Sequence, residues 1–284
     1  MLRIVQALMP EARPVIELLG LRPGPGAGGF RVFVSESGDV ALILSGIGKV
    51  AAAAATACLA MQDIPEETQT AAVWLNIGIA GHGSGTLGEA FLAHKVEDRA
   101  TGRSFYPPLV FSPPCLTAPL VTVDRVEDEY GAPVLYDMEA SGFMATATRF
   151  TTAELVHSLK VVSDGPAALA GEHRGVETLD AREIERLIRQ RLDVVDALVQ
   201  RLRQLHGEFH NLGAPPRVFA EYLARWHFTV SEERRLLQVL RRLEAVGWDA
   251  GTVPEDDLQA LKRGKDVLRI LDGILASRPV RFSS

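Results

Sequence analysis

Short apolar runs alternate with helical patterns over the first two thirds of the chain. Runs of this kind, bounded by glycine, proline and polar residues, are typical of buried strands. Between them, small and apolar residues predict short helices, among them an alanine-rich helix that ends near Met61 and a buried one at 142–147. The alternation predicts a three-layer α/β fold with a mixed sheet between helices. The strands expected on this basis span 2–8, 30–35, 40–44, 72–76, 88–96, 120–123, 133–135 and 155–162.

Three segments of the predicted α/β region are expected to bend rather than run straight. Residues 9–14 contain two prolines and predict a turn before a short helix at 15–19. Residues 45–50 form a glycine turn between a strand and the alanine-rich helix. Residues 78–85 hold four glycines and predict a second glycine corner after the strand at 72–76. Small residues at such corners allow a ligand to approach the backbone closely.

A long amphipathic helix follows the last predicted strand. Asp180 is placed to cap it, with Glu183 three residues later, and apolar residues then recur at helical spacing up to Leu205. Strands stop after about His206, and residues 210–216 read as a linker. We therefore predict an α/β domain over 1–206 and a helical extension over 207–284.

The extension is expected to contain three helices, at 217–226, 231–246 and 255–276. Thr229 and Glu232 form a capping box at the start of the second helix, and Gly247 follows its end. Amphipathic helices usually bury their apolar stripe locally, so intramolecular packing or an oligomer interface is favoured over docking of another protein.

Composition and charge exclude several classes of protein. The chain has 284 residues, of which 47% are hydrophobic and 23% charged, which is typical of a globular protein. A net charge of −6 argues against nucleic-acid binding. No apolar run approaches the roughly 20 residues of a membrane span, and the N-terminal run is broken too early for a signal peptide. With two cysteines, too few for a disulfide framework, we expect a cytoplasmic protein.

Polar residues and glycines fall where the predicted strands end. They occur at Glu11, 45–48, 76–81, 137–139 and 163–164. In an α/β sheet, ligands bind at the edge formed by the carboxyl ends of the strands. Each feature alone has an ordinary structural explanation. The glycines do not match the dinucleotide fingerprint, so no nicotinamide cofactor is predicted. Two cysteines are too few for a zinc cage, and no metal is predicted.

The carboxylates at this edge also have structural alternatives. Asp137 and Glu139 suit a helix start, as a cap and a first-turn acid. Asp164 lies in Ser-Asp-Gly-Pro, where aspartate commonly forms a turn. Three carboxylates on one edge, next to glycine corners that admit a ligand, together favour a binding or catalytic site.

The order of these motifs resembles the nucleoside phosphorylase superfamily. The resemblance rests on Glu11, Gly46–Ala53, Asn76–Gly81, Asp137–Ser141 and the Ser163–Asp164 pair. Within the superfamily, the sequence is most similar to the 5′-methylthioadenosine/S-adenosylhomocysteine nucleosidases, over about residues 1–206. The resemblance implies cleavage of the N-glycosidic bond of a purine nucleoside by a homodimer or other homo-oligomer without a cofactor.

The resemblance also implies roles for individual residues. Asp164, after Ser163, matches the acid that protonates purine N7, and Glu11 matches the residue that activates water. Glu139 matches the acceptor of the ribose hydroxyls, with Met138 packing against the sugar. Lys160 occupies the place of an arginine near the nucleophile. The remaining substrate-binding positions implied are Gly46, Gly78, Ile79, Ala80 and Gly81.

Two departures from the nucleosidases leave the function open. Ile79 stands where they carry a serine, and residues 120–126 contain no aromatic residue to stack on the base. Arg103, Lys95 or Lys160 could instead bind phosphate, which would make the protein a phosphorylase. A nucleoside-binding or partner-binding protein on the same scaffold is a further alternative. His82 and His94 are expected at the surface or in loops rather than on the substrate.

Overall fold

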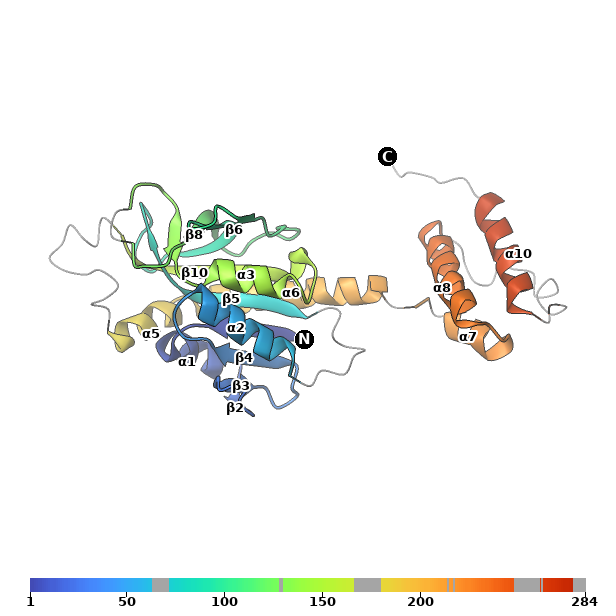
Figure 1. Cartoon of the computed structure of the whole chain (residues 1–284), viewed down its shortest axis with the longest axis horizontal. Helices are drawn as coiled ribbons and strands as arrows, with labels where there is room; N and C mark the ends of the chain where they lie inside the picture. Colours follow the sequence, from blue (N-terminus) through green and yellow to red (C-terminus); the bar gives the residue numbers. More distant parts are fainter. Residues whose placement is uncertain are drawn as a thin grey trace. The chain divides into compact units, whose positions relative to one another are not determined.

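The computed structural model describes residues 1–62, 72–127, 130–165, 180–213, 215–216, 218–247, 261 and 263–277. These residues form two compact units, Met1–His210 and Asn211–Ser284, and each is described by itself. Figure 1 shows the elements of both units, coloured along the sequence.

The first unit is built on a ten-stranded mixed sheet. Its order is β10-β6-β8-β9-β5-β1-β4-β3-β2, with β7 paired to β6. Parallel pairing joins β1 to both β4 and β5, and joins β5 to β10. The strands are β1 (Leu2–Gln6), β2 (Arg22–Pro23), β3 (Val32–Val34), β4 (Val40–Leu44), β5 (Val73–His82), β6 (Ala90–Asp98), β7 (Ser104–Phe105), β8 (Leu116–Thr122), β9 (Leu135–Asp137) and β10 (Val156–Asp164).

One half of this sheet closes on itself. β10 pairs with β5 as well as with β6, so β5, β10, β6, β8 and β9 follow one another around a closed ring. At the rim of the ring, Gly81 of β5 lies opposite Asp164 of β10 on one side and Tyr136 of β9 on the other. Closure therefore brings residues from three distant parts of the chain to one point, which the pairing of neighbouring strands in an open sheet would not do.

Helices cover both faces of the sheet and bury two apolar layers (Figure 1). On one face, α2 (Lys49–Ala60) and α3 (Ala140–Ala147) pack against each other. They approach closely because Gly142 lies against the backbone of Lys49, where a Cβ atom would come within 1.9 Å of the Lys49 carbonyl oxygen. The other face carries α1 (Met9–Leu18), α5 (Ala181–Arg189) and α6 (Leu192–Gly213), and a 3₁₀ turn, η2 (Ala153–Leu155), precedes β10. The predicted three-layer α/β fold is thus confirmed.

The structure corrects two predictions near the expected site. The segment 78–81 is not a glycine corner: β5 runs through it to His82, because β10 pairs with it along its length. The first helix begins at Met9 rather than Val15. The Glu11 side chain accepts hydrogen bonds from the backbone N–H groups of Ala7 and Leu8, which holds the helix start in place although Pro14 lies inside the helix.

The predicted long helix and the linker after it also differ from the structure, whereas the predicted cap at Asp180 does not. It is interrupted between Arg189 and Leu192, so α5 and α6 are separate helices. The capping of α5 by Asp180 is confirmed, since its Oδ1 accepts a 2.8 Å bond from the backbone N–H of Glu183. The linker expected at 210–216 begins later than predicted, because α6 continues to Gly213.

The second unit has an apolar core of its own. Its described helices are α7 (Val218–Arg225), α8 (Val230–Ala245) and α10 (Gly264–Ser277). The capping box of Thr229 and Glu232 is confirmed, and so is Gly247 as the stop, with a φ of 72°. Residues 255–260, predicted to begin the third helix, lie outside the described residues. The buried core comprises Tyr222, Trp226, Phe228, Leu236, Val239, Leu240, Leu243, Val267, Leu268 and Leu271.

Membrane insertion of a helix has no support in the described part of either unit, where every helix is too short or too polar to cross a bilayer.

Candidate active site

A pocket of about 120 Å³ opens where β5, β9 and β10 end. It therefore lies at the edge of the sheet where the sequence predicted a ligand. Five carboxylates line it, while the described residues contribute no lysine or arginine to its wall. The lining comprises Ala7, Leu8, Glu11, Ile47, Ile79, Ala80, Gly81, Val123, Val126, Glu127, Tyr130, Tyr136, Asp137, Met138, Glu139, Ser163 and Asp164.

Glu11 is held by three backbone N–H groups. Its Oε2 accepts from Ala7 at 3.2 Å and from Leu8 at 2.9 Å, and its Oε1 accepts from Ile79 at 2.9 Å. Burial raises the pKa of Glu11, although these donors and Lys160 oppose the rise. Gly78 makes room for this carboxylate, since a Cβ atom there would lie 2.8 Å from Glu11 Oε1. The carboxylate is thus fixed in place and has a stronger affinity for a proton than an exposed glutamate.

Glu139 lies at the N-terminal end of α3 and is 8% exposed. Its Oε1 accepts a 2.8 Å bond from the backbone N–H of Gly48, in the turn before α2. Burial, and next the charge of Asp137, raise the pKa of Glu139 to about 7. Ile47 of the same turn lines the pocket, whereas Gly46, the residue expected there, does not.

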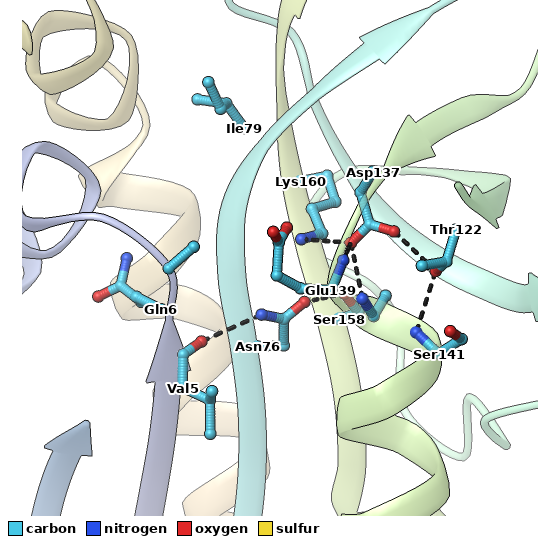
Figure 2. A network of polar contacts seen from close by, with 12 residues as sticks. Val5, Gln6, Asn76, Ile79, Thr122, Asp137, Glu139, Ser141, Ser158 and Lys160 are labelled. Carbon is cyan, nitrogen blue, oxygen red and sulfur yellow. Dashed lines mark hydrogen bonds and ion pairs between the residues drawn. The ribbon is translucent and has the colours of Figure 1, made fainter. Parts of the chain in front are cut away.

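Asp137, which lines the pocket, forms a buried ion pair with Lys160 (Figure 2). Lys160 Nζ lies 2.8 Å from Asp137 Oδ2, and the side chains are 1% and 0% exposed. Burial acts to lower the pKa of Lys160, but Asp137, Glu139 and Glu11 outweigh it and the pKa is raised. Lys160 is therefore a charged group that faces three carboxylates and is already paired with one of them.

The expected helix start is half right: the N-cap residue of α3 is Glu139, which is therefore not a first-turn acid, but the Asp137 side chain does bond the first backbone N–H of the helix. Its Oδ2 accepts from the backbone N–H of Ala140 at 2.8 Å, where α3 begins, and its Oδ1 accepts from Thr122 Oγ1 at 2.7 Å. Thr122 Oγ1 in turn accepts from the backbone N–H of Ser141 (Figure 2). Because both oxygens of Asp137 are engaged by the protein, Glu139 is the carboxylate of this pair that has an oxygen left for a ligand.

A second polar contact fixes the strands below the pocket. Asn76 Nδ2 donates to the carbonyl of Val5 at 3.1 Å, and Asn76 Oδ1 accepts from Ser158 Oγ at 2.8 Å (Figure 2). These bonds tie β1, β5 and β10 together beneath the side chains of the site. A satisfied buried network of this kind favours one fixed arrangement of the strands.

Asp164, at the end of β10, is 2% exposed. Burial raises its pKa, while hydroxyl donors from Ser163 and Tyr130 oppose the rise. Ser163 Oγ donates to Oδ1, and the phenol of Tyr130 donates to Oδ2. A carboxyl group in this setting holds a proton at a higher pH than an exposed aspartate, as a general acid requires.

Two aromatic residues of the pocket lie beyond residues 120–126, where the sequence offered none. Tyr130 and Tyr136 both line it, with ring centroids 5.6 Å apart in an edge-to-face arrangement. The guanidinium of Arg99 lies 5.3 Å from the centroid of the Tyr136 ring. The sequence could have indicated them through their closeness to Met138. β9 is short, so residues just before it reach the same end of the sheet as Met138.

The cations and histidines considered for other roles lie elsewhere. Lys95 pairs with Glu97, and Arg103 stacks over Phe105 at 4.6 Å, so neither lines the pocket. His82 is buried rather than exposed. Its Nδ1 accepts from the backbone N–H groups of Ser84 and Gly85, at 2.9 and 2.6 Å, which makes it part of a turn. His94 is exposed, as expected.

Comparison with solved structures identifies this architecture. A 5′-methylthioadenosine nucleosidase from Arabidopsis thaliana superposes with a TM-score of 0.56 and 16% identity, covering 71% of this chain and 95% of its own. The first unit has a nucleosidase fold. It is the α/β nucleoside phosphorylase-like fold, as the motifs predicted.

Two proteins from Helicobacter pylori share the fold. The 5′-methylthioadenosine/S-adenosylhomocysteine nucleosidase, solved with butyl-thio-DADMe-Immucillin-A, superposes with a TM-score of 0.55 and 14% identity, covering 70% of this chain and 97% of its own. Futalosine hydrolase superposes with a TM-score of 0.54 and 14% identity, covering 70% of this chain and 97% of its own. No family model matches the sequence, and no curated protein sequence matches it either.

Proposed function

We propose that this protein hydrolyses the N-glycosidic bond of a purine nucleoside related to 5′-methylthioadenosine or S-adenosylhomocysteine, releasing the free base and a ribose derivative. One observation carries the proposal. Two buried carboxyl groups, both with raised pKa values, meet the same stretch of β5: Glu11 at the N–H of Ile79 and Asp164 opposite Gly81. Two residues of strand span about 6.5 Å, a distance on the scale of a sugar ring with its base.

Asp164 is the proposed general acid. When the bond between C1′ and the base nitrogen breaks, its electron pair goes to the base. An unprotonated base would depart as an anion, which is a poor leaving group. The proton of Asp164 passes to purine N7 and neutralises the leaving base. Burial raises the pKa of Asp164, so the group carries that proton closer to neutral pH. A well-placed acid contributes roughly 10²- to 10⁴-fold in rate.

Glu11 is the proposed general base. The oxygen of a water molecule forms the new bond to C1′, and a proton of that water passes to Glu11. The raised pKa of Glu11 strengthens it as a base, and its three backbone donors fix its position. After turnover Glu11 holds a proton and Asp164 lacks one, and exchange with solvent restores both.

Glu139 and Met138 are the proposed ribose contacts. Gly48 engages Oε1 of Glu139, and the other oxygen can accept a sugar hydroxyl. A carboxylate here also stabilises the positive charge that develops on the sugar. Met138 lines the same pocket and can pack against the ring.

Water is favoured over phosphate as the nucleophile. Phosphate is a dianion near neutral pH, and proteins bind it with arginine, lysine or backbone N–H groups. Among the described residues, the pocket is lined by carboxylates and by no arginine or lysine, and Lys160 is occupied by Asp137. This charge pattern repels phosphate and favours a neutral or cationic substrate.

The proposal includes a homo-oligomer in the cytoplasm. Ile47 and Val50, beside the pocket at the start of α2, are 59% and 78% exposed, and a second copy of the chain could cover them. Cys58 and Cys115 are free thiols, which suits a reducing compartment. Sedimentation equilibrium would measure the oligomeric state.

The experiment supplies methylthioadenosine, S-adenosylhomocysteine, adenosine and inosine, each with and without phosphate, and follows free base. We expect base from at least one of them at the same rate in both buffers. Base formed only with phosphate would refute hydrolysis in favour of phosphorolysis. Binding without any base release would refute catalysis and support a nucleoside-binding protein.

A further inference from the structure

The phenol of Tyr130 is hydrogen-bonded to Asp164, the proposed general acid. Its hydroxyl donates to Asp164 Oδ2, across 34 positions of sequence, while Ser163 donates to Oδ1. Both oxygens of Asp164 therefore already have a hydrogen-bonding partner within the chain. To receive the Asp164 proton at N7, a purine must bind next to an Asp164 oxygen. Both of these oxygens already accept a hydrogen bond from a protein hydroxyl group.

The space that Tyr130 fills is created by Gly81. A Cβ atom on Gly81 would lie 2.6 Å from Cε1 of Tyr130, 2.7 Å from its hydroxyl oxygen and 2.8 Å from Asp164 Oδ2. The phenol and the carboxyl thus meet over the bare backbone of this residue. Tyr136 supports the Tyr130 ring edge to face at 5.6 Å. Tyr130 is consequently seated in the pocket and is not a surface side chain that merely points toward it.

The Tyr130 phenol lies where the proposed function places the purine base. It is a flat aromatic ring with one polar atom directed at Asp164, and it lies among the pocket-lining residues. A purine placed with N7 at the same oxygen would overlap the phenol. The hydrogen bond between Tyr130 and Asp164 must break before a base can bind at this oxygen. Hydrogen bonds to carboxylates are among the stronger ones in proteins, so this step weakens base binding by a measurable factor.

We propose that Tyr130 is a positioning residue that competes with the substrate's base for Asp164, so that the base binds by displacing the phenol from the space over Gly81. The inference rests on the proposed function and names the group that sets the strength of base binding.

Displacement also changes the state of Asp164. While the phenol donates to Oδ2, it opposes the rise in the pKa of Asp164 that burial causes. Once the base replaces the phenol, burial is opposed by Ser163 alone, and the protonated acid is favoured. Binding of the base thus prepares the acid that the proposed reaction uses.

The test compares the wild type with Tyr130→Phe, which keeps the ring and removes the competing donor. Calorimetry measures the affinity for free adenine and free hypoxanthine, and kinetics measures KM and kcat on the substrate found active. We expect Tyr130→Phe to bind base about 10-fold more tightly and to lower KM by a similar factor, since one hydrogen bond to a carboxylate no longer has to be broken. We expect kcat to change less than about 2-fold, because the phenol has left Asp164 in the bound complex.

Tyr106→Phe is the matched control, because Tyr106 is 66% exposed and does not line the pocket. We expect it to match the wild type in base affinity, KM and kcat. Thermal denaturation of each variant shows whether it is folded before its affinity is compared.

Unchanged or weaker base binding in folded Tyr130→Phe would overturn the inference, and so would a large fall in kcat with KM unchanged. The proposed function fails separately, when the wild type releases base from no nucleoside. Base affinities alone still decide the competition in that case, since their measurement needs no turnover.

Discussion

Lys160 and Asp137 are joined by an ion pair that is withdrawn from solvent, with Nζ 2.8 Å from Oδ2 and exposures of 1% and 0%. Glu11 and Glu139 act on the same lysine, and Gly78 leaves the space beside its Nζ open. One positive charge therefore stabilises three carboxylates at the floor of the pocket. Removal of one partner from such a pair leaves an uncompensated buried charge.

Lys160→Met should destabilise the protein strongly. Asp137 would remain buried without its counter-ion, which costs about 3–5 kcal/mol of unfolding free energy. Urea denaturation at pH 7 measures it. Lys95→Met is the control, because Lys95 pairs with Glu97 at the surface, where solvent screens the pair and its loss should hardly change stability. Equal effects of the two substitutions would contradict the structural role of the buried pair.

Gly78→Ala should reduce turnover far more than stability. The new methyl group would lie 2.8 Å from Glu11 Oε1, so the carboxylate must move from its three donors. Displacement of a catalytic base is expected to lower kcat about 100-fold. Gly207→Ala serves as the control, because nothing lies within 4 Å of the position in α6 and alanine favours helix. Wild-type turnover in Gly78→Ala would remove Glu11 from the mechanism.

Asp164→Asn should abolish turnover and leave the fold intact. The amide cannot donate the proton that the base requires, and the expected fall in kcat is roughly 10²- to 10⁴-fold. Steady-state kinetics and circular dichroism measure the two properties. Asp39→Asn, at an exposed position paired with Arg203, is the matched control and should retain full activity. A rate near that of the wild type in Asp164→Asn would exclude Asp164 as the acid.

The pKa of Glu139 predicts a pH dependence of stability. The folded-state pKa is raised from 4.5 to about 7, so the folded protein binds more protons than the unfolded chain between these values. Stability should therefore fall as the pH rises from about 4.5 to 7, by about 3 kcal/mol from this group. Glu139→Gln lacks the titration, and unfolding free energies at pH 5 and pH 8 should differ less in this variant. Identical pH dependence in the two proteins would contradict the raised pKa.

The C-terminal unit should be dispensable for the fold of the first unit. The two units have separate apolar cores, and α6 supplies Leu198 and Leu202 to the first. A chain that ends at Gly213 keeps α6 whole and should melt within a few degrees of the first transition of the full chain. Activity measured in parallel shows whether the helices serve the reaction. Loss of folding would show that the cores depend on each other.

The local pattern of the sequence was enough to predict the class of fold. Apolar runs and glycine turns predicted a mixed α/β sheet, and short-range signals at Asp180, Thr229 and Gly247 predicted helix ends that the structure confirms. These features depend on residues within a few positions of each other, which is why they can be read without tertiary information. The candidate carboxylates were found for a related reason, since the ends of parallel strands meet at one edge.

Contacts between distant segments decided the rest. The glycines at 78–81 belong to a strand because β10 pairs with them, and Lys160 faces carboxylates because Asp137 lies across the closed ring of strands. Tyr130 reaches Asp164 because closure of that ring returns its loop to the rim. Periodicity records which face of an element is buried, but not which distant residue it meets. The sequence alone therefore determined the kind of sheet and the edge that carries the acids. The tertiary structure determined which residues surround each acid and thereby shift its pKa.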